Sequence, residues 1–249
     1  MNILKYLYDI KDSKGCGFLT LLDPDKFPSN ELIDIAELCS DNGADAILVG
    51  SSFLLNNEFD YMIEHIKKQI SIPLILFPGN SNQVSKFADA VLFLSLISGR
   101  NPEYLIGQHI RAAPILKNYN IEIIPTGYIL IETGKLTSVE YISNTKPIPK
   151  DKNDIAMATA LAGEYLGMKL IYLEGGSGAL FPVSCNIIES IYNYITIPII
   201  VGGGITTPKL AEERVIAGTS FIVIGNSLEN KCNKSLIKEF ASAIHYKQK

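Results

Sequence analysis

The residues best suited to chemistry lie in the stretch Tyr172-Leu-Glu-Gly-Gly-Ser-Gly178, where a carboxylate is followed at once by three glycines and a serine. An apolar run that begins near Lys169 leads into Glu174, which predicts a buried strand ending in an acid and a glycine loop. Because glycine has no Cβ and tolerates positive φ, the N–H groups of such a loop can approach an anion closely. The pattern therefore predicts a phosphate cradle with an acid at its edge.

Two later apolar runs also stop in glycine. Ile199-Ile-Val-Gly-Gly-Gly-Ile205 ends in a triple glycine, and Phe221-Ile-Val-Ile-Gly-Asn226 ends in Gly225 and Asn226. Each of these taken alone is typical of a tight turn. Because three successive strand ends share the pattern, we interpret them as one shared anion site.

Glu174 is the candidate catalytic residue. An acid on an otherwise apolar strand is seldom a solvated surface charge, and a buried ion pair is the alternative interpretation. Beside a bound phosphate ligand, Glu174 could accept a proton from a hydroxyl group as general base.

Asp23 ends the first apolar run and is expected to lie beside Ser51 and Ser52, which end the second. Carboxylate and hydroxyl oxygens suit Mg²⁺, whereas the simpler alternative is that Asp23 caps a turn before a proline. Lys26 and Arg100 are candidate cations for a diphosphate, although both lie in predicted loops where solvated basic side chains are common.

These motifs belong to a regular alternation of predicted strands and helices. Eight apolar runs are each followed by a helical pattern, except that residues 80–88 after the third run are short and polar. The alternation predicts an α/β fold, a single-domain (β/α)8 TIM barrel over residues 1–249 with an incomplete third helix. An open doubly wound sheet would instead place its phosphate fingerprint after the first strand. We expect residues 2–11 to form a short helix or lid over the bottom of the barrel and residues 132–152 a surface loop over its mouth.

Composition limits the kind of partner. Hydrophobic residues make up 47% of the chain and the net charge is −4, which argues against a broad nucleic-acid-binding surface. A reducing, cytoplasmic compartment is expected because no C-x-x-C pair occurs among Cys16, Cys39, Cys185 and Cys232. No metal-ligand spacing relates the histidines, which we interpret as surface residues: His65, His109 and His245.

Five stretches, in order over nearly the whole chain, resemble the geranylgeranylglyceryl phosphate synthase family, which includes heptaprenylglyceryl phosphate synthases. They are Leu22-Asp-Pro-Asp-Lys26, Ile47-Leu-Val-Gly-Ser-Ser52, Tyr172 to Gly178, Val201-Gly-Gly-Gly-Ile205 and Ile224-Gly-Asn226. The resemblance implies a Mg²⁺-dependent prenyltransferase. Such an enzyme joins a polyprenyl, geranylgeranyl-type diphosphate to the 3-hydroxyl of sn-glycerol 1-phosphate, which forms an ether lipid precursor and releases diphosphate.

The resemblance also implies roles for particular residues. Asp23 and Ser52 fall on the family's Mg²⁺ positions. The family's glycerol-phosphate positions fall on Tyr172, Leu173, Glu174, Gly175, Gly176, Ser177, Gly178, Gly203, Gly204, Gly225 and Asn226. The family lacks a full third helix and uses the gap for the prenyl tail. Tyr104 lies near the place where an aromatic residue limits chain length in one branch, but its local order differs, so the accepted length is left open.

Other expectations concern partners and alternatives. The resemblance implies a homo-oligomer, a dimer or a hexamer, and an apolar groove would allow transient contact with a membrane surface. The alternative functions are another phosphate-binding TIM barrel, an isomerase or lyase, and a non-catalytic barrel that binds a phosphorylated metabolite.

Overall fold

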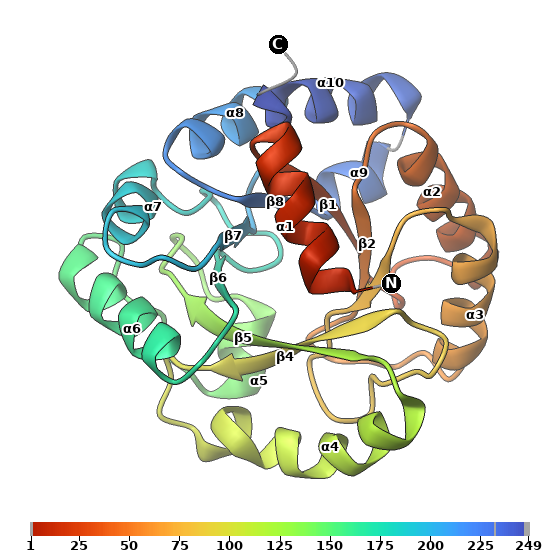
Figure 1. Ribbon diagram of the computed structural model, residues 1–249, viewed down its shortest axis with the longest axis horizontal. Coiled ribbons are helices and arrows are strands. Elements are labelled where there is room, and N and C mark those ends of the chain that lie inside the picture. Colours follow the sequence, from red (N-terminus) through yellow and green to blue (C-terminus); the bar gives the residue numbers. More distant parts are fainter. Residues whose placement is uncertain (1, 232, 247–249) are drawn as a thin grey trace.

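Eight parallel strands form a closed barrel at the centre of the computed structural model, which describes residues 2–231 and 233–246 (Figure 1). Each strand pairs with its neighbours in chain order, and β8 closes on β1. The strands are β1 (Gly17–Leu22), β2 (Ala46–Val49), β3 (Leu74–Leu76), β4 (Ala90–Leu96), β5 (Glu122–Leu130), β6 (Leu170–Glu174), β7 (Ile199–Gly202) and β8 (Phe221–Ile224). The predicted TIM-barrel fold is confirmed.

Helices surround the barrel (Figure 1). Apolar side chains of most of these helices pack against the outward side chains of the strands. The helices are α1 (Ile3–Lys14), α2 (Ser29–Asp41), α3 (Phe59–Gln69), the π-helix η1 (Glu103–Gly107), α4 (Gln108–Tyr119), α5 (Ser138–Ser143), α6 (Asn153–Tyr165), α7 (Cys185–Tyr192), α8 (Pro208–Ile216), α9 (Asn226–Lys231) and α10 (Lys234–Ile244). Residues 77–89, between β3 and β4, contain no helix, as predicted for the third unit. The expected loop over residues 132–152 is partly wrong, because it contains α5.

Side chains on β6 alternate between the inside and the outside of the barrel, as a pleated strand requires. Leu170 and Tyr172 belong to the cluster inside the barrel, whereas Ile171 and Leu173 pack toward the helices. The same alternation turns Glu174, the last residue of β6, to the inside. It therefore faces inward at the carboxyl end of the strands, where parallel barrels carry their active sites.

The opposite end of the barrel is closed by α1, which lies across it (Figure 1). Ile3 and Leu7 of α1 are buried in the cluster inside the barrel. The carboxylate of Glu122 accepts hydrogen bonds from the N–H groups of Ile3 and Leu4 at 2.5 and 2.9 Å, which is favourable at a helix N-terminus. The prediction of a short helix over the bottom of the barrel is confirmed.

A buried carboxylate joins α1, β1 and the residue after α10. Asp45 is 2% exposed and accepts hydrogen bonds from His245 Nε2 at 2.8 Å, Lys14 Nζ at 2.5 Å and the Phe18 N–H at 2.8 Å. Burial alone would raise the pKa of Asp45, but the hydrogen bonds from His245, Lys14 and Phe18 outweigh burial, and the pKa is lowered. The ionised carboxylate therefore stabilises the closed end of the barrel.

The histidines and cysteines lie mostly inside the molecule. His109 and His245 are buried and His65 is half-buried, so the prediction of surface histidines is wrong. Cys16 and Cys39 are buried and Cys185 is half-buried, while Cys232 lies outside the described residues. In the part of the chain that the structure describes, no helix has the length and apolar character needed to cross a membrane.

We expect Asp45→Asn to lower the free energy of unfolding by about 3 kcal/mol, because Lys14 and His245 lose a buried anionic acceptor. The pKa of Asp45 is lower in the folded protein than in the unfolded chain, where it is about 3.9. Asp45 therefore contributes to the free energy of unfolding above the unfolded pKa, and this contribution is lost as the pH falls through the lower folded pKa. Urea denaturation across this acidic range should show a steeper loss in the wild type than in the variant.

The matched control is Asp9→Asn, which removes the exposed ion pair between Lys5 and Asp9. This change should alter the free energy of unfolding by less than about 0.5 kcal/mol. Equal losses in the two variants would contradict the structural role of Asp45.

Candidate active site

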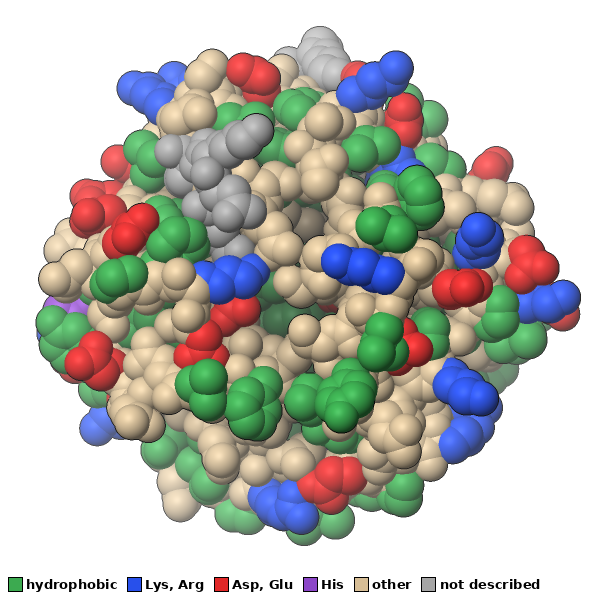
Figure 2. Space-filling view, turned by 180° about the vertical axis from the view of Figure 1, so that it is seen from behind, with side chains coloured by type: hydrophobic (Ala, Val, Ile, Leu, Met, Phe, Trp, Pro, Cys, Tyr) green, Lys and Arg blue, Asp and Glu red, His purple; other side chains and the backbone are tan. Residues whose placement is uncertain are grey.

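A polar cavity of about 820 Å³ lies at the carboxyl end of the strands. Figure 2 looks onto this face, opposite α1, and shows a hollow at its centre. Most of the predicted site residues line the cavity: Asp23, Ser52, Tyr172, Glu174, Gly176, Ser177, Gly178, Gly203, Gly204, Gly225 and Asn226. The fold thus brings together the ends of β1, β2, β6, β7 and β8.

Two predicted binding residues and one candidate cation do not line the polar cavity. The side chain of Leu173 faces the helices because it lies on the outward side of β6. Gly175 lines a neighbouring cavity formed mainly by residues 130–149. Arg100 lies elsewhere on the surface and donates a hydrogen bond to the carbonyl of Gly99. Roles for these three residues in binding therefore stay predictions.

Glu174 is a buried carboxylate with two hydrogen-bond donors. It is 6% exposed, its Oε1 accepts from the Gly176 N–H at 2.5 Å, and its Oε2 accepts from the Tyr128 hydroxyl at 3.1 Å. Burial raises the pKa of Glu174, and the Gly176 N–H and the hydroxyls of Tyr128 and Tyr172 counter this effect only in part. A raised pKa brings a carboxylate closer to the neutral range in which a general base is efficient.

Three aromatic rings pack together beside Glu174. The ring centroids of Phe77 and Tyr172 are 5.1 Å apart, those of Tyr128 and Tyr172 5.3 Å, and those of Phe77 and Tyr128 5.9 Å. Burial and the nearby Glu174 carboxylate raise the pKa of Tyr172, although its buried hydroxyl makes no well-formed hydrogen bond among the described residues. A buried hydroxyl without a partner is costly, so this group is suited to a ligand in the polar cavity.

Sequence reasoning missed Tyr128 and Phe77. Tyr128 pairs in register with Tyr172 across β5 and β6, and this register places its hydroxyl at Glu174. The available signal was alternation on β5, because Tyr128 and Leu130 share the inward side. Phe77 directly follows the three-residue strand β3 and carried no comparable signal.

The glycines are required where the loops after β6 and β7 meet. Gly203 has φ +86°, and a Cβ there would lie 2.7 Å from Glu174 Oε1 and 2.6 Å from the nitrogen of Gly176. Gly204 has φ +71°, and its own Cβ would lie 2.8 Å from the backbone of Phe181. A side chain at either position would strain the backbone and collide with its neighbours, and at Gly203 it would reach the carboxylate of Glu174.

Asp23 and Ser52 form an oxygen-rich edge of the same cavity. Lys26 Nζ lies 3.9 Å from Asp23 Oδ2 and donates to Asn226 Oδ1 at 2.5 Å, so the loops after β1 and β8 are tied together. Within residues 2–231 and 233–246, no group of three or more His, Cys, Asp or Glu could hold a metal ion. The oxygen donors fit Mg²⁺ if ligand oxygens and water complete its coordination.

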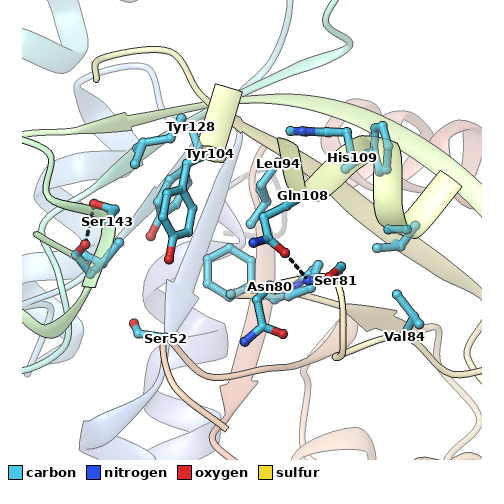
Figure 3. A pocket seen from close by; sticks show the side chains of 18 of the residues that line it. Ser52, Asn80, Ser81, Val84, Leu94, Tyr104, Gln108, His109, Tyr128 and Ser143 are labelled. Carbon is cyan, nitrogen blue, oxygen red and sulfur yellow. Dashed lines mark hydrogen bonds between the residues drawn. The ribbon is translucent and has the colours of Figure 1, made fainter. Parts of the chain in front are cut away.

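An apolar groove of about 810 Å³ continues from the polar cavity toward α4. The two share Ser51, Ser52, Phe77, Tyr128 and Val139 in their walls, and Figure 3 shows Ser52 and Tyr104 on one side of the groove and Val84 and His109 on the other. The rest of the wall is largely hydrocarbon: Val84, Val91, Phe93, Leu94, Leu96, Ala112 and Leu116. The groove lies where a helix would otherwise follow β3, and it suits a long apolar chain.

The fold and the site define a (β/α)8 barrel with a buried acid in a glycine-lined polar cavity. Residues 8–244 match the model described as the PcrB family, and the chain belongs to this family.

Named relatives agree with this assignment. The geranylgeranylglyceryl phosphate synthase of Chitinophaga pinensis is 48% identical over 236 residues, which are 94% of this chain and 93% of the relative. The enzyme of the same name from Methanosphaera stadtmanae is 40% identical and is covered completely, by 98% of this chain. The crystal structure of (S)-3-O-geranylgeranylglyceryl phosphate synthase from Thermoplasma acidophilum in complex with its substrate sn-glycerol-1-phosphate superposes with a TM-score of 0.94. It is 33% identical, and 99% of each chain is covered.

We expect Gly203→Ala to abolish measurable binding of inorganic phosphate, because the added Cβ would meet the Gly176 nitrogen and the Glu174 carboxylate. Gly167→Ala is the matched control, since Gly167 has a similar φ of +89° but nothing within 4 Å of an added Cβ. Both changes should cost about 1 kcal/mol of stability through the positive φ, and Gly203→Ala should cost more because its Cβ also makes close contacts. Only Gly203→Ala should affect binding. Calorimetric titration with phosphate distinguishes them, and equal affinity in the two variants would argue against the glycine cradle.

Proposed function

We propose that this protein is a prenyltransferase that joins a polyprenyl, geranylgeranyl-type diphosphate to the 3-hydroxyl of sn-glycerol 1-phosphate and releases diphosphate. The observation that carries the proposal is the position of Glu174, a buried carboxylate between a glycine-lined polar cavity and an apolar groove. Relatives that carry this enzyme's name are 40–48% identical over most of the chain, which supports the same assignment.

The polar cavity would hold the acceptor. The N–H groups of Gly175 and Gly176 donate to Gly202 and Glu174, so other backbone N–H groups of the glycine loops after β6 and β7 bind the phosphate of sn-glycerol 1-phosphate. The Tyr172 hydroxyl, which makes no well-formed hydrogen bond among the described residues, is placed to bind its glycerol part. The hydrogen bonds from Gly176 and Tyr128 fix the carboxylate of Glu174. Glu174 then accepts the proton of the 3-hydroxyl while that oxygen bonds to C1 of the prenyl chain and diphosphate leaves with the electron pair of the broken C–O bond.

The apolar groove would hold the donor chain. Its walls exclude water from the reacting carbon, and the rings of Phe77 and Tyr128 lie where the groove meets the polar cavity. Aromatic faces favour positive charge, so both rings are placed to stabilise the cationic character that develops at C1. Alkyl transfer of this kind depends on alignment, which the two adjoining cavities provide.

Mg²⁺ is part of the proposal, with Asp23 and Ser52 as the protein ligands. Ser52 makes no side-chain hydrogen bond within the described residues and lines both cavities, so its hydroxyl is available at their junction. When bound there, the ion would neutralise the charge of the departing diphosphate. Asp23 and Ser52 would supply only part of its coordination, which fits the preference of Mg²⁺ for phosphate oxygens and water.

The expectations of a homo-oligomer, a cytoplasmic location and transient membrane contact stay predictions. So does the length of the prenyl chain, for which Tyr104 in the wall of the groove is a candidate determinant.

The direct test is formation of lipid-soluble product from labelled sn-glycerol 1-phosphate with prenyl diphosphates of increasing length, with and without Mg²⁺. We expect product from the 1-phosphate but not from sn-glycerol 3-phosphate. Because Glu174 is the proposed base, Glu174→Gln should lower kcat by about 10²–10⁴-fold, and Asp23→Asn should abolish the Mg²⁺ dependence together with most of the activity. Absence of product at every length would leave an isomerase, a lyase or a non-catalytic phosphate-binding barrel as the remaining assignments.

We expect Tyr128→Phe to move the acidic limb of the pH–rate profile to higher pH. The Tyr128 hydroxyl stabilises the charged form of Glu174, so its removal raises the pKa of Glu174 further. Activity that depends on the ionised base is then lost at a higher pH than in the wild type. Tyr6→Phe, which removes a hydroxyl hydrogen bond to the Asp45 carbonyl at the closed end of the barrel, is the control and should leave the profile unchanged. A Tyr128→Phe profile identical to that of the wild type would contradict the coupling of Tyr128 to Glu174.

A further inference from the structure

The polar cavity carries little positive charge for the ligands assigned to it. Among the described residues that line it, Asp23 and Glu174 are acidic and Lys26 is the single basic side chain. Lys26 is already hydrogen-bonded to Asn226 and lies close to Asp23. The Mg²⁺ proposed at Asp23 and Ser52 would offset the charge of the diphosphate, so a further cation is expected near the glycine loops for the phosphate of glycerol phosphate.

The segment between β5 and α5, residues 131–137, lies along the glycine loop that follows β6. Thr133 Oγ1 donates a hydrogen bond of 2.6 Å to the carbonyl of Gly175, which fixes the two segments side by side. Two residues further along, Lys135 Nζ lies 3.1 Å from the position that a Cβ on Gly178 would occupy. Lys135 itself lines the neighbouring cavity, which Glu174 and Gly175 also line, and its ammonium group reaches the glycine loop at Gly178, a residue that lines the polar cavity.

Lys135 is also available to a ligand. Its side chain is exposed and makes no hydrogen bond or ion pair with any residue in the described ranges. Gly178 has φ +70° and no side chain, which leaves the space beside the ammonium open. Figure 2 shows Lys or Arg side chains on both sides of the hollow at the centre of this face.

We propose that Lys135 is a second cationic ligand of the acceptor phosphate, a role that rests on the proposed function of the polar cavity. Backbone N–H groups of the glycine loops bind the phosphate from inside the polar cavity. The ammonium of Lys135 donates to one phosphate oxygen at the edge of the loop, near Gly178. A flexible lysine suits this position because it acts as a point charge that follows the ligand. Lys135 thus contributes affinity and not proton transfer, which stays with Glu174.

The test is calorimetric titration of sn-glycerol 1-phosphate into the full-length chain and three variants. Lys135→Gln should raise Kd about tenfold, because it removes one charge-assisted hydrogen bond to phosphate. Lys135→Arg should recover most of the affinity, since it keeps the charge. Lys146→Gln is the matched control, because Lys146 is exposed, lines the same neighbouring cavity as Lys135 and carries the same charge, whereas only Lys135 is placed next to Gly178.

The outcomes separate this inference from the proposed function. Weaker binding in Lys135→Gln, with rescue by arginine, unchanged melting temperature and wild-type affinity in Lys146→Gln, supports the role of Lys135. Wild-type affinity in Lys135→Gln, or equal loss in both glutamine variants, overturns it and leaves the proposed function intact. If the wild type itself does not bind sn-glycerol 1-phosphate, the proposed function fails and this inference fails with it.

Discussion

The site depends on one interaction, the burial of the Glu174 carboxylate with donors on both of its oxygens. A carboxylate in a barrel interior is unfavourable unless hydrogen bonds compensate for the lost water. Here the Gly176 N–H and the Tyr128 hydroxyl provide that compensation. The arrangement in turn restricts the next strand end, since any side chain on Gly203 would collide with the same carboxylate. Gly203, which lines the polar cavity, therefore also makes room for the acid.

The second feature of the site, the apolar groove, exists because no helix follows β3. β3 is three residues long and is followed by a segment without a helix, so that side of the barrel has no full covering layer. The apolar groove occupies this gap and meets the polar cavity at Phe77 and Tyr128. A charged substrate in the polar cavity and a hydrocarbon substrate in the apolar groove can thus bring their reacting oxygen and carbon atoms together where the two cavities meet. The strand ends of the barrel form the polar cavity, and the absence of a helix after β3 leaves room for the apolar groove.

The sequence predicted the fold and the polar half of the site because both are local signals. Apolar runs ending in Asp23, Glu174 and glycine mark strand ends, and the closed topology brings strand ends together. Tyr128 was not predictable in the same way, since its contact with Glu174 depends on the register between β5 and β6. Leu173 was assigned to the site by resemblance, although strict alternation with Glu174 turns its side chain outward. The burial of His109 and His245 likewise depends on tertiary packing, which no spacing reveals.

The most direct measurement is a crystal structure of the protein with sn-glycerol 1-phosphate, Mg²⁺ and an unreactive thiodiphosphate analogue of the prenyl donor. The account predicts the acceptor phosphate against the glycine loops, the 3-hydroxyl oxygen within about 3 Å of the Glu174 carboxylate, and the hydrocarbon chain in the apolar groove. A 3-hydroxyl turned away from Glu174, or a prenyl chain bound outside the groove, would contradict the claim that one buried acid joins the two cavities.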